Sequence, residues 1–193
     1  MSIDAKLLQK RLGVTQDGII GRDTWRAVFA RFGADTTRAR QLAIAMNVHA
    51  TAYEMMAPLR LSHFFAQLIH ESGSFRYMEE IASGAAYEGR ADLGNTVKGD
   101  GVRYKGRGPI QITGRANYQK FGRLIGIDIE ETPDLAANPS IGLHLALEYW
   151  RDRKLNAMAD ADDVVGITKK INGGTNGLAD RRAQLVKAKA LFL

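Results

Sequence analysis

The stretch of residues 61–80, LSHFFAQLIHESGSFRYMEE, constrains the fold more than any other part of the chain. Its apolar residues recur at the spacing i, i+3, i+4, i+7 and i+8, which predicts one face of a helix packed against a core. Those residues are Leu61, Phe64, Phe65, Leu68 and Ile69. Glu71 follows at the edge of this face, and Ser72-Gly73-Ser74 then interrupts the pattern. The C-terminal end of a helix, next to apolar groups, disfavours an ionised carboxylate and so suits a general acid, although a solvated glutamate at a helix end has the same pattern.

Length and composition narrow the class of protein. The chain has 193 residues, 45% of them hydrophobic, and no cysteine. We expect one domain, with or without a small appendage, and no disulfide, thiolate nucleophile or cysteine-based metal site. The N-terminal residues lack the apolar run of a signal peptide, and no segment has the length needed to span a bilayer. We therefore expect a protein made without a signal peptide and without membrane insertion.

The formal net charge of +6 favours an acidic partner. Nucleic acid, anionic lipid and peptidoglycan all fit that description. The basic residues are spread along the chain, and neither a recognition helix nor an aromatic ladder is recognisable. We therefore expect no binding to nucleic acid.

Helical periodicity dominates the rest of the chain, so the predicted fold is mainly α. Residues 82–108 are instead rich in glycine and charge, and a loop of this length is often functional, so we expect it to lie along a cleft. Residues 110–113 read as a short extended piece. Helices are predicted at about residues 4–12, 23–32, 36–46, 50–56, 61–72, 117–125, 141–150, 164–171 and 178–193.

Several hydrolytic chemistries lack the residues they need. The four histidines, His49, His63, His70 and His144, do not have the spacing of a zinc site. Neither a Gly-x-Ser-x-Gly elbow nor a phosphate-binding Gly-x-x-x-x-Gly-Lys loop occurs. We therefore expect no metal and no cofactor.

Paired carboxylates remain as the candidate chemistry. Glycoside hydrolysis needs one carboxyl group to protonate the leaving oxygen and a second to activate water or attack the sugar. Glu71 could be the acid. Spacing alone leaves its partner open among Glu79, Glu80, Glu88 and Asp92.

The N-terminal sequence LLQKRLGVTQDGIIGRDTWRAV resembles the repeat of peptidoglycan-binding domains, of which it covers only a part. The resemblance implies a small wall-binding helical unit, degenerate or truncated, over residues 1–33 and a catalytic domain over residues 34–193. The alternative is a helical hairpin that only packs on the catalytic part, because so small a unit needs support.

Three further segments, HFFAQLIHESGSFRYMEE, GDGVRYKGRGPIQITGRANYQKFG and INGGTNGLADRR, follow one another in the chain. In this order they resemble the family 19 glycoside hydrolases, which comprise chitinases and related lysozyme-like endolysins of phages and bacteria. The resemblance covers most of residues 38–192. It implies a mainly helical, lysozyme-like fold with a substrate cleft between lobes.

The same resemblance assigns roles to individual residues. Glu71 matches the catalytic acid, and Glu80, nine positions on, matches the general base, with the adjacent Glu79 as an alternative. Thr113 matches the hydroxyl that helps to hold the attacking water. The positions implied to contact substrate are His70, Tyr104, Gln111, Asn117, Asn172 and Arg181. Arg181 is expected to keep Glu80 ionised.

These features predict an endolysin that hydrolyses β-1,4 bonds of bacterial peptidoglycan by an inverting acid/base mechanism. We expect a monomer, made in the cytoplasm of the host bacterium, that acts on the cell wall after release. Compared with plant chitinases, the chain lacks the cysteines and most long loops, and a short, open cleft suits a cross-linked polymer. A chitinase and a non-catalytic wall-binding protein are the alternatives. Whether a muramidase or a glucosaminidase bond would be cut stays open.

Overall fold

The structure is a computed structural model, and it describes residues 2–193. It confirms a mainly α fold, and within residues 2–193 the only β pairing is two isolated bridges, Glu79–Arg107 and Arg107–Ile112. No helix in this range is long and apolar enough to cross a membrane. The helices are α1 (Ala5–Leu12), α2 (Arg22–Arg31), α3 (Thr36–His49), α4 (Pro58–Glu71), α5 (Asp100–Arg103), α6 (Arg115–Ile125), α7 (Pro139–Asp152), α8 (Leu155–Asp160), α9 (Val164–Asn172) and α10 (Leu178–Phe192), with 3-10 turns η1 (Ala85–Tyr87), η2 (Ala91–Leu93) and η3 (Pro133–Ala137).

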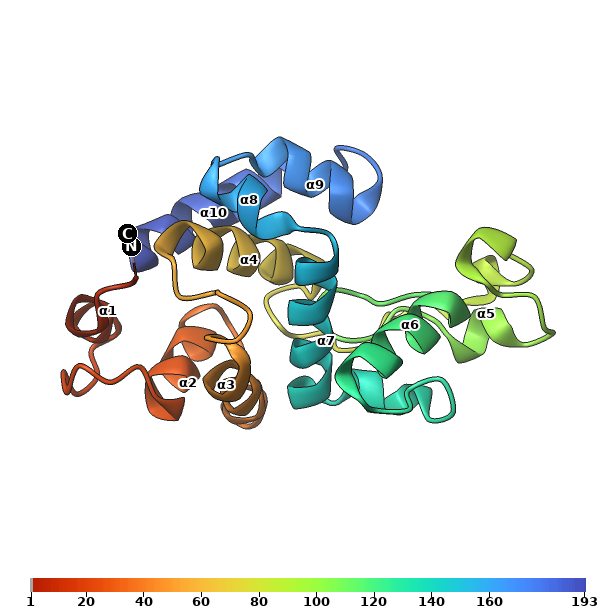
Figure 1. Cartoon of the computed structure of the whole chain (residues 1–193), viewed down its shortest axis with the longest axis horizontal. Helices are drawn as coiled ribbons and strands as arrows, with labels where there is room; N and C mark the ends of the chain where they lie inside the picture. Colours follow the sequence, from red (N-terminus) through yellow and green to blue (C-terminus); the bar gives the residue numbers. More distant parts are fainter. Residues whose placement is uncertain (1) are drawn as a thin grey trace.

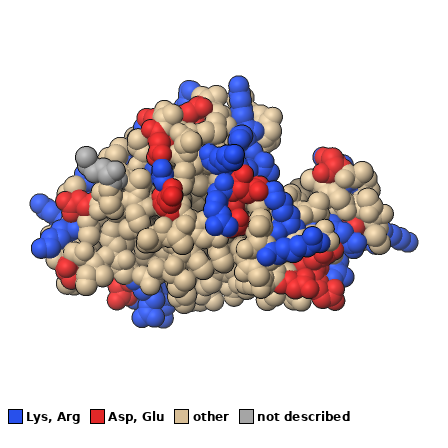
Figure 2. Space-filling view, in the orientation of Figure 1, with Lys and Arg blue, Asp and Glu red and all other residues tan. Residues whose placement is uncertain are grey.

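The molecule consists of a helical body and an arm (Figure 1). The body contains α1 to α4 and α8 to α10, the arm carries α5 and α6, and α7 stands between them. The space-filling view shows a notch in the outline between body and arm (Figure 2). Helix α4 ends near α7, and the chain then runs out into the arm.

Helix α4 is the centre of the body. Pro58 occupies its first turn, where the missing N–H costs no hydrogen bond, and residues 61–69 are all buried. The predicted apolar stripe is therefore present, but polar faces of the helix are buried too. His63 is fully buried, and its Nε2 lies 2.7 Å from Asp162 Oδ1. Helix α10 packs along α4 and covers much of this surface.

The N-terminal helices share the core of the body. Phe29 of α2 lies 5.1 Å from Phe65 of α4 between ring centroids, and Phe32 lies 6.1 Å from Phe192 of α10. The Ile3 amide donates a 2.8 Å hydrogen bond to Met56 O. This packing favours a hairpin supported by the catalytic part over a unit with its own core. Whether residues 1–33 contact the cell wall stays a prediction.

The arm is folded where a structureless loop was predicted. Residues 82–108 form η1, η2 and α5, joined by turns. Asp100 is 2% exposed and pairs with Arg115 at 3.0 Å, while buried Asn95 binds the Tyr87 carbonyl and the Arg115 amide. A Cβ on Gly101 would lie 2.5 Å from Glu88 N, so only glycine fits this approach.

The helix predicted at residues 50–56 is wrong. They form a series of turns, with Glu54 at φ 55°. A left-handed residue interrupts helical hydrogen bonding, which the apolar spacing of this segment did not reveal.

Candidate active site

The first candidate carboxylate, Glu71, is the last residue of α4. Its side chain is 18% exposed and its Oε1 accepts a 2.5 Å hydrogen bond from Arg181 Nη2. Arg181 is 1% exposed, and its Nη1 donates to Gln67 Oε1. The packing of α10 along α4 thus brings the Arg181 guanidinium to Glu71. That Arg181 also keeps Glu80 ionised stays a prediction.

Two predicted substrate-binding residues hold the loop next to Arg181. Asn172 donates from Nδ2 to Asn176 O at 2.8 Å and accepts from Gly174 N at 2.9 Å, while Asn176 O also faces Arg181 Nε at 3.4 Å. His70 Nδ1 lies 2.6 Å from Asp180 Oδ2. Asn172 is exposed and His70 partly so, but their hydrogen bonds within the chain fit a positioning role as well as sugar binding.

The second candidate carboxylate, Glu80, is tied to Gly106. The Glu80 amide donates to Gly106 O at 2.9 Å, and the Gly106 amide donates to Glu80 Oε2 at 2.8 Å. A Cβ on Gly106 would lie 2.6 Å from Gln111 Oε1, 2.7 Å from Glu80 Oε2 and 3.3 Å from Thr113 Oγ1. Three predicted site residues therefore gather their oxygens around one glycine.

Short-range hydrogen bonds fix this group. Gln111 adopts φ 58° and donates from Nε2 to Gly108 O at 2.9 Å. Thr113 Oγ1 donates to Gln111 O at 3.0 Å, and Asn117 Nδ2 donates to Thr113 O at 2.8 Å. The extended piece predicted at residues 110–113 is thus a tight turn closed by the bridge between Arg107 and Ile112. Asn117, on α6, stabilises the turn through its hydrogen bond to Thr113 O.

Glu79 and Glu80 have different surroundings. Successive side chains of an extended segment point to opposite sides. Glu79 accordingly pairs with Lys105 at 3.1 Å and Arg107 at 3.2 Å, away from the Gly106 group. The geometry thus favours Glu80 over Glu79 as the partner of Glu71.

Sequence reasoning missed Tyr87, which lies on η1 beside the Glu80 carboxylate. Burial, together with the negative charge and hydrogen bond of Glu80, raises the pKa of the Tyr87 phenol. The phenol therefore stays protonated and can donate to Glu80. No periodicity marks this residue, because only the folding of the arm brings it to Glu80.

Tyr104 does not fit its predicted role. It is 1% exposed, its ring centroid lies 5.3 Å from that of Tyr118, and its hydroxyl donates to Glu130 O at 3.3 Å. A residue buried in the arm cannot contact a sugar, so this prediction is wrong.

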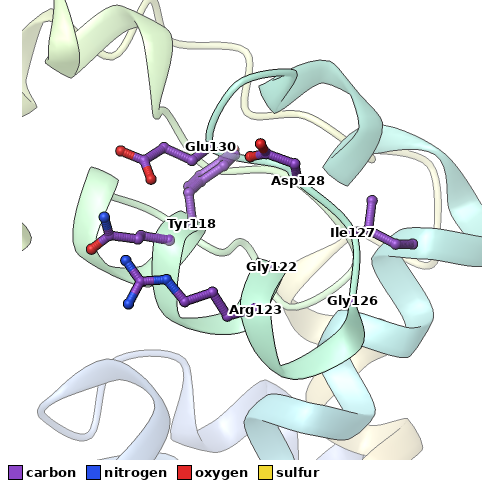
Figure 3. A pocket seen from close by; sticks show the side chains of 8 residues that line it. Tyr118, Gly122, Arg123, Gly126, Ile127, Asp128 and Glu130 are labelled. Carbon is purple, nitrogen blue, oxygen red and sulfur yellow. The ribbon is translucent and has the colours of Figure 1, made fainter.

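The arm also carries a hollow of about 340 Å³ that is separate from both carboxylates. Tyr118, Arg123, Asp128 and Glu130 line it (Figure 3). None of the predicted site residues does. Among residues 2–193, no three His, Asp or Glu side chains gather closely enough to hold a metal ion.

A helical frame that holds two carboxylates in separate polar settings has the groups of a glycoside hydrolase. The chain belongs to glycoside hydrolase family 19, since the family model described as chitinase class I matches residues 12–182. The match crosses residue 33, so it includes part of the N-terminal unit.

Curated relatives and solved structures agree with this assignment. An endochitinase of Arabidopsis thaliana is 38% identical over 157 residues, which cover 79% of this chain and 52% of the relative. A family 19 domain-containing protein of Haemophilus influenzae is 39% identical over 109 residues, 56% of this chain and 52% of the relative. The chain therefore spans about half the length of these relatives.

Two solved chitinases have the same fold. Chitinase C from Streptomyces griseus HUT6037 is 17% identical with a TM-score of 0.66 over 98% of this chain and 91% of its own. A class IV chitinase from Zea mays is 22% identical with a TM-score of 0.60, over 97% and 90%.

Proposed function

We propose that this family 19 glycosidase is an endolysin-type enzyme that hydrolyses β-1,4 bonds of bacterial peptidoglycan. The observation that carries the proposal is that Glu71 and Glu80, which are joined by the short segment 72–79, have different surroundings. Glu71 contacts buried Arg181, whereas Glu80 shares Gly106 with Gln111 and Thr113. An acid and a base need different surroundings, and the two carboxylates have different partners.

In the proposed mechanism, Glu71 protonates the glycosidic oxygen as the bond to the sugar breaks. The carboxylate that results is negatively charged, and the Arg181 guanidinium, 2.5 Å away, stabilises it. Glu80 accepts a proton from a water molecule as that water attacks the sugar from the opposite face. Inversion of this kind requires roughly 6.5–9.5 Å between the two carboxyl groups.

Thr113 and Gln111 would orient the attacking water. The Thr113 hydroxyl and the Gln111 amide oxygen both lie close to the Glu80 carboxylate at Gly106. A hydroxyl and an amide can direct a water lone pair without adding charge. Tyr87, beside Glu80, would steady the carboxylate in the same way.

Charge supports peptidoglycan as the substrate. The net charge of +6 favours an anionic wall. We propose that the enzyme acts as a monomer after release from the cytoplasm of the host bacterium. Lysis should slow as salt screens the attraction, and salt-independent lysis would remove this support.

Chitin is the second candidate substrate, because two relatives that each cover 79% of this chain are named endochitinases. Purified peptidoglycan and chitin should be digested in parallel and the soluble products identified by mass spectrometry. Release of disaccharide-peptides from peptidoglycan is expected, and the reducing-end sugar names the bond. Products from chitin alone would establish the chitinase instead, and products from neither would favour a non-catalytic wall-binding protein.

A further inference from the structure

A second hollow lies where the N-terminal helices meet the last helix. Its volume is about 440 Å³. It takes side chains from α1, from α10, and from α2 and the residue that follows it. The lining residues are Arg11, Arg31, Phe32, Lys187, Ala190 and Leu191.

The side chains that line this hollow carry a net positive charge. Arg11, Arg31 and Lys187 are exposed, and within residues 2–193 none of them forms an ion pair. Arg11 Nη1 donates to Leu191 O at 3.0 Å and Lys187 Nζ donates to Gln184 Oε1 at 3.3 Å, which leaves their charges in place. Three like charges around one hollow repel each other, and an anion between them would relieve that repulsion.

The floor of the hollow is apolar and fixed. Phe32 packs against Phe65 at 5.5 Å and Phe192 at 6.1 Å between ring centroids. Leu191 is 6% exposed and belongs to the same core. Ala190 is small and leaves room above this floor. A fitting ligand therefore combines an anionic group with a small apolar group.

We propose that this hollow binds the C-terminal carboxylate of a peptide with small apolar side chains. A guanidinium binds a carboxylate through two parallel hydrogen bonds, and two arginines and a lysine surround this hollow. Methyl side chains fit the space over Ala190, Phe32 and Leu191. The source of the peptide rests on the proposed function, since peptidoglycan carries peptide stems that end in alanine.

The hollow is well placed to hold the enzyme on its polymer. The end of α10 and α1 lie at the far end of the body from the arm (Figure 1). A stem bound there would leave the notch and the two candidate carboxylates free. Binding and hydrolysis can therefore be measured separately.

The test uses a fluorescein-labelled peptide ending in D-alanyl-D-alanine and the same peptide as its carboxamide. Fluorescence anisotropy with the full chain should show binding of the free acid and at least tenfold weaker binding of the amide. The triple variant Arg11→Gln, Arg31→Gln, Lys187→Gln should also bind the acid at least tenfold more weakly. Ala190→Leu, which fills the hollow but keeps the charges, should weaken binding as well.

The matched control is Arg22→Gln, Arg40→Gln, Lys98→Gln. These three residues are exposed and form no ion pair within residues 2–193, so the change in net charge is the same. Equal binding of acid and amide, equal loss in both triple variants, or no binding by the wild type overturns the proposal. Binding only to vesicles of anionic phospholipid would also overturn it. Turnover of glycan strands stripped of peptides is measured in parallel, and its absence would refute the glycosidase proposal without touching this one.

Discussion

The two candidate carboxylates are held by opposite means. Glu71 ends a helix whose residues 61–69 are all buried, and its partner Arg181 comes from a second long helix packed beside it. Glu80 lies in a segment of turns, fixed by backbone hydrogen bonds and by the close approach of Gly106. Hydrophobic packing sets the first position, whereas short-range polar contacts set the second.

This difference has a mechanical consequence. Packed cores shift little unless the whole body is destabilised, while segments with few buried apolar contacts open locally at low cost. Substitutions near Glu80 should therefore lower activity while the unfolding temperature stays nearly unchanged. Substitutions around Arg181 should affect both.

The largest effect is expected from Glu71→Gln. The amide cannot donate a proton to the leaving oxygen, and loss of a general acid costs about 10²- to 10⁴-fold in rate. Turbidity of a purified wall suspension should hardly fall with this variant. Glu131→Gln, at a side chain that is 82% exposed, is the control and should lyse like the wild type. Equal lysis by Glu71→Gln would refute the assignment of the acid.

The next largest effect on turnover distinguishes Glu80 from its neighbour Glu79. Glu80→Gln should slow turnover by about 10²-fold, because a general base is lost. Glu79→Gln removes only ion pairs to Lys105 and Arg107, at a side chain that is 42% exposed, and should leave turnover within a few-fold of the wild type. Initial rates on soluble glycan fragments provide the measurement. If Glu79→Gln proves the more damaging change, the base has been assigned to the wrong residue.

A smaller effect is expected from Gly106→Ala. The added methyl group would lie under 3 Å from oxygens of Gln111 and Glu80, so both side chains must move. We expect turnover to fall by about tenfold, the scale of a modest misplacement of reacting groups. Thermal unfolding should change little. Gly21→Ala, where the nearest atom is 3.9 Å away, is the control for a glycine outside the site. A large drop in unfolding temperature with Gly106→Ala would show that the arm is not the softer region.

The contrast between hydrophobic packing at Glu71 and short-range polar contacts at Glu80 also determines what the sequence can predict. Periodicity located α4 because its apolar residues are close in sequence, and α4 places Glu71. The contact between Glu71 and Arg181 joins residues 110 positions apart, so no local pattern reveals it. Family resemblance pointed to Glu80, Gln111 and Thr113, whose oxygens lie around Gly106 in the structure. It also pointed to Tyr104, whose burial depends on how the arm folds.

The smallest expected effect is a loss of stability at acid pH that arises from a histidine in the helical body. His49 of α3 and His144 of α7 stack with ring centroids 3.7 Å apart, and Tyr53 Oη lies 3.0 Å from His144 Nε2. Tyr53 also donates to buried Glu148 at 2.8 Å, and Arg151 pairs with that carboxylate. Burial, with repulsion from His49, lowers the pKa of His144 from 6.5 to about 4.

The lowered pKa of His144 makes the folded chain less stable at acid pH. Between pH 6.5 and 4 the unfolded chain binds a proton at His144 that the folded chain does not, so the free energy of unfolding falls as the pH falls through this window. Because the imidazole is partly exposed, we expect a loss of about 1–2 kcal/mol. Urea denaturation at pH 7 and pH 4.5 measures it, and His144→Gln should reduce the difference. The arm segment between residues 77 and 137 contains no histidine, so this loss belongs to the body, and a pH dependence unchanged in His144→Gln would rule out the stacked pair as its source.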